Sequence, residues 1–312
     1  MPTILANFEV PLLERWAQPL GWHGYELAAL LAIILIGGLC GMVGALVVGN
    51  RMAFFSDAMA HCAFAGISLG LIIWLAMGNT RNSEFLPTFL TIVMACFGAL
   101  IGAGIAFVRE RTALASDTVI GVFFAGALGF GAIVLEAFPK GRGFDVEKFL
   151  FGGPYTTQPF DLLLLAVLFL ITGVIFIWRY NQFALASFNP SLARSRGVKA
   201  AANNFLFILL LALIVNFSIS AVGVLLINAL LVVPAATATN LAGNMRQMFR
   251  YTFGLSLLVG LLGLMLSASV RVQIGGEPRQ FGVSGTIICL GVLLFALSMT
   301  WPTIRRRFAH LG

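Results

Sequence analysis

Charged residues are scarce in this chain. Only 10% of its 312 residues are Asp, Glu, Lys or Arg, whereas soluble domains carry about 25%. Hydrophobic residues make up 60%, and the mean hydropathy is +0.98. This composition excludes an ordinary soluble domain and predicts an all-α, polytopic membrane protein surrounded by lipid. The net charge of +7 would suggest nucleic acid for a soluble protein. Here it fits basic loops at the cytoplasmic surface, and no nucleic-acid partner is expected.

Cysteine and histidine are also few. The four cysteines all lie in apolar runs without a CxxC pair, so neither disulfides nor a thiolate metal site are indicated. His23 and His310 lie near the chain ends, which disfavours an intramembrane metalloenzyme with HExxH or three histidines. No Lys is followed by Ser or Thr, as a Walker A motif requires. We therefore expect no enzyme, no permanently bound cofactor, and ATP hydrolysis only on a separate subunit.

Apolar runs of about 20 residues predict nine membrane-spanning helices. The boundary between the sixth and seventh is the weakest, because only Ser218-Ile-Ser220 suggests a turn there, and eight spans is the alternative. The expected spans are 25–48, 54–77, 86–108, 118–138, 160–178, 203–219, 221–241, 251–270 and 282–301.

Three regions are expected along the chain. Residues 1–24 form an interfacial segment, 25–301 a single transmembrane domain, and 302–312 a basic tail. Most of the 19 Lys and Arg residues fall on one side if the N-terminus is outside and the C-terminus cytoplasmic, and the triplet Arg305–Arg307 favours that orientation. We therefore expect a multi-pass protein of the bacterial cytoplasmic membrane. The outer stretch 145–153 is either re-entrant or a plain loop.

Asp57 and His61 lie in the second apolar run. Placing a charged Asp within a membrane helix costs about 2.5–3.5 kcal/mol even on the mildest insertion scale. Their i, i+4 spacing places both side chains on one helix face. A carboxylate and an imidazole there can bind a divalent transition metal. A structural Asp–His pair is an equally weighted alternative on spacing alone. Cys62 points about 100° away from His61, so packing is its expected role.

Small residues and asparagines supply further packing signals. Gly37/Gly41, Gly66/Gly70 and Gly98/Gly102 repeat at four-residue spacing, which would let helix backbones approach closely. Asn216, Asn228 and Asn240 are expected to form hydrogen bonds between helices.

The inner loop at 179–202 differs from the other loops. Asn189 is a good N-cap, Pro190 suits the first helical position, and Gly197 suits a helix end. A helix of about two turns is therefore expected outside the membrane, with Phe183, Leu185, Phe188 and Leu192 as apolar anchors. It is either an interfacial connector or a knob that docks into a cytoplasmic partner.

Four blocks in order give the chain a family resemblance from about residue 25 to 300. It resembles the permease subunit of bacterial zinc, manganese and iron ABC importers, a type II importer architecture. The blocks are Arg51-Met-Ala-Phe-Phe-Ser-Asp57-Ala-Met-Ala-His61 with Gly66; Ser116-Asp117-Thr-Val-Ile-Gly121-Val-Phe-Phe-Ala-Gly126; Phe149-Leu-Phe-Gly152 with Ser187-Phe-Asn-Pro-Ser-Leu-Ala-Arg194 and Gly197; and Ala221-Val-Gly-Val-Leu-Leu226 with Leu231-Val-Val-Pro-Ala-Ala-Thr-Ala-Thr239.

The resemblance implies a homodimeric pore, a cytoplasmic ATPase beneath each subunit and an extracytoplasmic metal-binding protein. It implies that Asp57 and His61 are ligands of the transported metal. It also implies that the loop carries the ATPase-coupling helix, with the residues Phe183, Leu185, Phe188, Asn189, Pro190, Leu192, Arg194 and Gly197. Two departures stand out: Ser191 replaces a frequent acidic residue, and Ala65 replaces the Pro frequent in manganese-type members. The second departure favours zinc.

Other transport classes remain open on the sequence. A related permease for a metal chelate such as a siderophore would share the architecture but would not need the Asp–His pair. A proton-coupled secondary transporter would need its own intramembrane carboxylate relay, for which only Asp57 fits well, and the chain has no clear inverted repeat.

Overall fold

The computed structural model describes residues 14, 23–79, 83, 85–112, 114–136, 153–274 and 277–309. Over these residues it is helical, with nine helices long and apolar enough to cross a membrane. The expected all-α bundle is therefore confirmed, and nine spans are found rather than eight. The helices are α2 (Gly24–Gly49), α3 (Phe55–Ala76), α4 (Leu86–Arg111), α5 (Ser116–Glu136), α7 (Pro159–Phe188), α9 (Ala200–Val222), α10 (Val224–Leu241), α11 (Met245–Ser269) and α12 (Val283–Ala309).

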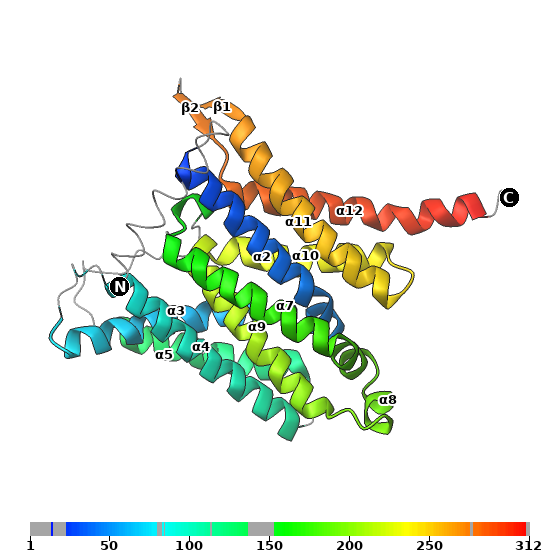
Figure 1. The fold of residues 1–312 in the computed structure, drawn as a ribbon, viewed down its shortest axis with the longest axis horizontal. Coiled ribbons are helices and arrows are strands. Elements are labelled where there is room, and N and C mark those ends of the chain that lie inside the picture. Colours follow the sequence, from blue (N-terminus) through cyan, green and yellow to red (C-terminus); the bar gives the residue numbers. More distant parts are fainter. Residues whose placement is uncertain are drawn as a thin grey trace.

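The helices pack around α2 and α10 (Figure 1). Helix α2 contacts α7, α10 and α11, and it is the most deeply buried span. Helix α10 lies against α11 and α12 on one side and reaches α3 on the other. Helix α3 packs on α4 and α5, while α9 joins α4 to α7. Helix α5 stays largely exposed on its outer face. The core is therefore apolar all round α2, and the lightly covered helices lie at the periphery.

The break between α9 and α10 falls at Gly223, three residues after the predicted turn. Gly223 has φ +86° and ψ 168°, a backbone conformation that only glycine adopts readily. Its N–H closes the last turn of α9 on the Ile219 carbonyl oxygen. The serines at 218 and 220 lie inside α9, so the turn signal came from the wrong residues.

Three further differences concern element ends. Helix α7 continues to Phe188, so the first ten residues of the predicted inner loop are helical. Helix α12 runs to Ala309 and includes the basic triplet predicted as tail. Strands β1 (Arg271–Ile274) and β2 (Glu277–Gln280) form an antiparallel pair that the sequence analysis missed, although a Gly-Gly pair separates them. The stretch 145–152 and residues 1–22, except Glu14, lie outside the described residues.

Glycines mark the closest helix contacts, as predicted. A Cβ at Gly66 would lie 3.1 Å from the Met94 Cα of α4, and one at Gly102 would lie 2.7 Å from the Ala212 Cβ of α9. A Cβ at Gly41 would lie 2.7 Å from the Phe253 Cα of α11. The close approach of these backbones replaces the hydrophobic driving force that is missing within a bilayer.

Gly44 provides a direct test of this packing. A Cβ there would lie 2.7 Å from the Leu231 carbonyl oxygen of α10, and backbone cannot move aside as a side-chain tip can. We expect Gly44→Leu to destabilise the bundle by about 3 kcal/mol or more, visible as a lower melting temperature in heated size-exclusion chromatography. Gly173→Leu is the matched control, because its Cβ meets nothing within 4 Å. Equal melting temperatures for the two variants would contradict the tight α2–α10 contact.

Candidate metal site and coupling helix

The turn between α2 and α3 positions the candidate metal site. Arg51 adopts φ +54°, which reverses the chain within a few residues, and Met52 is fully buried beneath the turn. Helix α3 then begins at Phe55, so Asp57 lies in its first turn. A carboxylate is stabilised there by the positive end of the helix dipole. The backbone thus favours an anion at this place in the bundle.

Asp57 and His61 lie on the face of α3 that meets α5 and α10. The Asn228 side-chain amide of α10 donates a hydrogen bond to Asp57 Oδ1 at 3.4 Å. The His61 ring stands edge-on to Phe124 of α5, with centroids 4.8 Å apart. Both side chains are half-buried. The two predicted donors therefore share one helix face and remain partly accessible.

Within the part of the chain that the structure describes, one copy offers two such donors at this place. Among the described residues, no cluster of three or more His, Cys, Asp or Glu side chains could hold a metal. Zinc takes four ligands in most protein sites. Cys62 is buried in the core, as its predicted packing role requires, and supplies no third donor here. The two candidate donors are therefore fewer than the four that a zinc site usually takes.

The predicted hydrogen bonds between helices are found for two of the three asparagines. Asn228 bridges to Asp57, and Asn240 donates to Ser298 Oγ of α12 at 3.0 Å. Asn216 instead donates to the Ala212 carbonyl oxygen of its own helix. Gly98 explains this difference, because its missing side chain leaves the space in which the Asn216 amide lies.

The short helix outside the spans is present as predicted. It is α8 (Pro190–Ser195), and the Asn189 side chain accepts a hydrogen bond from the Leu192 N–H at 3.1 Å. Gly197 follows with φ +72°, which suits a helix end. Leu192 is 40% exposed, and Asn189, Arg194 and Gly197 are also exposed.

Other residues of the predicted coupling set face inward. Phe183 is 2% exposed and packs inside the bundle against Phe176 and Phe207. Phe188 lies at the end of α7, where its ring covers Gly49 of α2. Leu185 is half-buried, and it accepts the closing backbone hydrogen bond of α7 from Asn189. The surface available to a partner is therefore α8 itself.

A polar cluster that the sequence did not predict lies where α2, α4 and α7 end. The Asn50 amide donates to Ser187 Oγ at 2.8 Å and to the Leu46 carbonyl oxygen. The Arg109 guanidinium of α4 donates to Asn50 Oδ1 at 3.3 Å and contacts Met52 Sδ. The ends of α2, α4 and α7 are thus tied together directly before α3 and α8. No spacing or composition signal marks these residues, because they come from three distant parts of the sequence.

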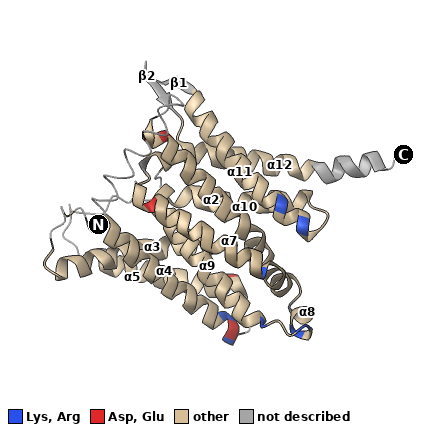
Figure 2. Ribbon diagram, in the orientation of Figure 1, with Lys and Arg blue, Asp and Glu red and all other residues tan. Residues whose placement is uncertain are grey.

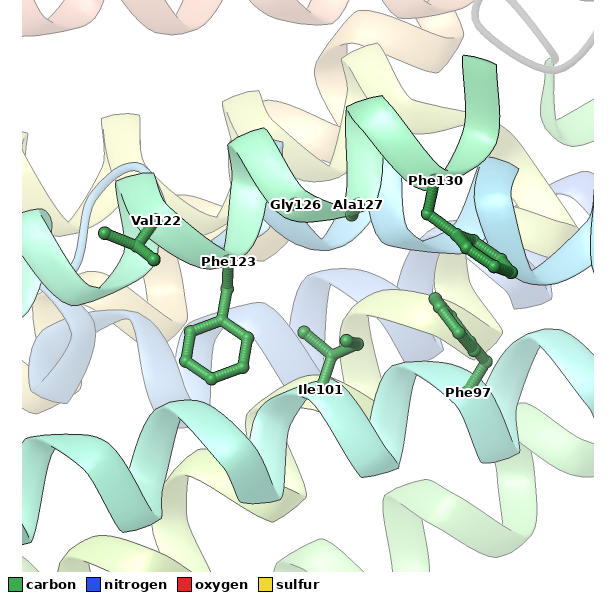
Figure 3. A pocket seen from close by; sticks show the side chains of 7 residues that line it. All are labelled: Phe97, Ile101, Val122, Phe123, Gly126, Ala127 and Phe130. Atoms are coloured by element: carbon green, nitrogen blue, oxygen red, sulfur yellow. The ribbon is translucent and has the colours of Figure 1, made fainter. Parts of the chain in front are cut away.

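An apolar cleft of about 280 Å³ opens between α4 and α5 (Figure 3). The Phe97 and Phe130 rings stack across it with centroids 5.8 Å apart. On the outer face of α5, Val122 and Ile133 are 64% and 71% exposed. Phe124, whose ring contacts His61, lies on the opposite side of α5 from Val122, because two helical positions span about 200°.

Comparison with known proteins defines the class. Residues 24–301 match the ABC 3 transport family, and the chain belongs to that family. It is therefore a multi-pass protein of the cytoplasmic membrane with an ABC importer permease fold.

Individual relatives agree with this assignment. The manganese import system permease protein ScaB of Streptococcus gordonii is 29% identical, over 92% of this chain and 95% of the relative. The high-affinity zinc uptake system membrane protein ZnuB of Haemophilus influenzae is 26% identical, over 87% and 95%. The fold matches PsaBC from Streptococcus pneumoniae, solved in complex with Fab, with a TM-score of 0.66 and 24% identity over 88% of this chain and 90% of that chain. The resemblance noted in the sequence is confirmed.

Proposed function

We propose that this chain is the permease subunit of an ATP-driven importer for a divalent transition metal. The observation that carries the proposal is the Asp57–His61 pair, held on one face of α3 inside a bundle of this family. Its relatives include permeases named for manganese import and for zinc uptake. The hydrogen bond from Asn228 orients the carboxylate, as the hydrogen-bond partners of metal ligands commonly do.

A second copy of the chain would complete the site. Two-fold symmetry would bring two carboxylates and two imidazoles together, a four-donor set suited to zinc, manganese or iron. Two carboxylates would also neutralise the divalent charge within a medium of low dielectric. The exposed apolar side chains of Val122 and Ile133 on α5 support a surface that a second copy would cover.

The charge distribution supports an orientation. Lys and Arg gather at the end of the bundle that carries α8 (Figure 2). We assign this end to the cytoplasm, with the N-terminus outside and the C-terminus inside. Helix α8 then faces a separate ATPase, and the opposite end faces a metal-binding protein. Zinc is the favoured substrate because Ala65 replaces the Pro typical of manganese-type members.

Metal accumulation tests this proposal. Cells expressing the chain with its ATPase and binding protein are expected to accumulate one of zinc, manganese or iron above cells in which the ATPase is omitted. Mass spectrometry of washed cells measures all three metals at once. The same metal content with and without the ATPase would refute an ATP-driven metal importer.

A further inference from the structure

A second pocket lies away from the metal site, between α2, α7 and α11. It has a volume of about 600 Å³, within the range of protein pockets for small ligands. Figure 1 shows these three helices side by side on the near face of the bundle. We call this pocket the α2–α7–α11 groove. It is lined by Gly41, Met42, Phe176, Tyr180, Arg246, Phe249, Arg250, Phe253 and Gly254.

The groove has two chemically different parts. Arg246 and Arg250 are one turn apart in the first two turns of α11, so both guanidinium groups lie at the same end of the groove. Tyr180 of α7 lies beside them, its ring packed edge-on to Phe249 at 4.9 Å. The remaining lining is hydrocarbon and bare glycine backbone. Such a groove suits a molecule with an anionic head and an apolar chain.

The positive charge lacks a protein partner among the described residues. The ion pair found there within 4.0 Å joins His23 and Glu26, far along the chain from either arginine. The first turn of α11 contains no acidic residue, although the positive end of a helix dipole favours one. The two guanidinium groups are instead repelled by the partial positive charge at that end. An anion bound between them would remove this conflict.

The surroundings of the groove belong to the membrane interface. On α7, Ile177 and Trp178 are 85% and 86% exposed, next to the groove residues Phe176 and Tyr180. An exposed Trp beside exposed aliphatic side chains is typical of the headgroup level of a bilayer. A molecule could therefore enter the groove sideways from the lipid.

We propose that the α2–α7–α11 groove binds an anionic phospholipid. Its phosphate lies between Arg246 and Arg250 and accepts from the Tyr180 hydroxyl. One acyl chain runs over Gly41 and Gly254 between Met42 and Phe253. Basic pockets between membrane helices on the cytoplasmic side bind anionic headgroups in this manner. A carboxylate of a soluble partner would satisfy the arginines but would leave the apolar lining unfilled. The proposal does not depend on the transported metal.

Native mass spectrometry of the full chain, released from detergent, tests the proposal. The probes are phosphatidylglycerol, phosphatidylcholine with the same acyl chains, and inorganic phosphate. We expect retained phosphatidylglycerol and neither of the others. The double variant Arg246→Gln/Arg250→Gln is expected to bind phosphatidylglycerol roughly thirtyfold more weakly, since each basic residue near an anionic lipid contributes about a fivefold factor. Arg196→Gln/Lys199→Gln removes two charges near α8 at the same end and is expected to retain binding.

A steric variant separates the groove from general charge. A Cβ at Gly254 meets nothing within 4 Å, so Gly254→Leu fills the groove without a backbone clash. It is expected to displace phosphatidylglycerol although both arginines remain. Gly285→Leu, in equally open space on α12, is expected to keep the lipid. Unchanged lipid binding in Gly254→Leu, equal retention of phosphatidylcholine, or displacement of the lipid by inorganic phosphate would each overturn the proposal. Loss of ATPase binding, rather than of lipid, in the double arginine variant would assign the arginines to the ATPase instead.

Discussion

Asp57→Asn is expected to reduce metal accumulation by about a hundredfold, to the background of cells lacking the ATPase. The change keeps the shape of the side chain and its hydrogen bond to Asn228 but removes the negative charge. A divalent cation in a site of low dielectric then loses both its ligand and its neutralising partner. Outer-shell changes alone cost 10- to 100-fold at metal sites, so losing a ligand in each subunit is expected to reach background. His61→Gln is expected to give the same result.

Two variants control this prediction. Cys62→Ala alters the neighbour of His61 that faces the core, and it is expected to preserve accumulation. Asn228→Ala removes the hydrogen bond but keeps the ligand, and a loss of roughly tenfold is expected. Each variant is first checked for copurification with the ATPase, so that lost assembly is not read as lost transport. Full accumulation in Asp57→Asn or His61→Gln would return the pair to a structural role.

Leu192→Asp is expected to break the coupling between the permease and its ATPase. Leu192 is 40% exposed on α8, so an ATPase that docks on this helix would cover its apolar side chain. Burying an unpaired carboxylate at that contact costs at least about 2 kcal/mol, equivalent to roughly thirtyfold weaker binding. Copurification of the ATPase is expected to fall by that factor, and metal accumulation is expected to fall with it.

Leu192→Met is the matched variant and is expected to retain both ATPase copurification and metal accumulation, because it keeps an apolar side chain of similar volume. Asn189→Ala tests the same contact by weakening the helix that carries Leu192. It removes the side chain that caps α8 and costs about 1 kcal/mol of helix stability. Normal ATPase copurification with Leu192→Asp would exclude α8 as the docking helix.

The sequence predicted local features well. Hydrophobic runs located the nine spans found among the described residues, since the length of an apolar segment must match the bilayer. The α8 helix followed from Asn189, Pro190 and Gly197 because capping depends on neighbours within four residues. The shared face of Asp57 and His61 followed from helical periodicity alone. Each of these inferences uses residues close together in the chain.

Features that depend on distant contacts were not predictable. The Asn50 cluster draws on residues 137 and 59 positions away, and nothing in their local pattern marks them. The groove between α2, α7 and α11 is likewise a product of packing. Phe183 has the composition of a docking anchor, but α7 extends past it and buries it against Phe207. Gly223 shows the same limit on a smaller scale, since two serines gave a stronger turn signal than the glycine that bends the chain.

The hydrogen bonds of Asn50 connect the ends of three helices of the bundle. The end of α7 cannot shift away from the α2–α3 turn without breaking the Asn50–Ser187 hydrogen bond and lifting the Phe188 ring off Gly49. Arg109 secures the same turn from the side of α4. Helix α8 follows α7 directly, so we expect a displacement of α8 to reach the first turn of α3 through these contacts rather than through the length of a transmembrane helix. The carboxylate of Asp57 belongs to that first turn, so it lies directly after the linked helix ends.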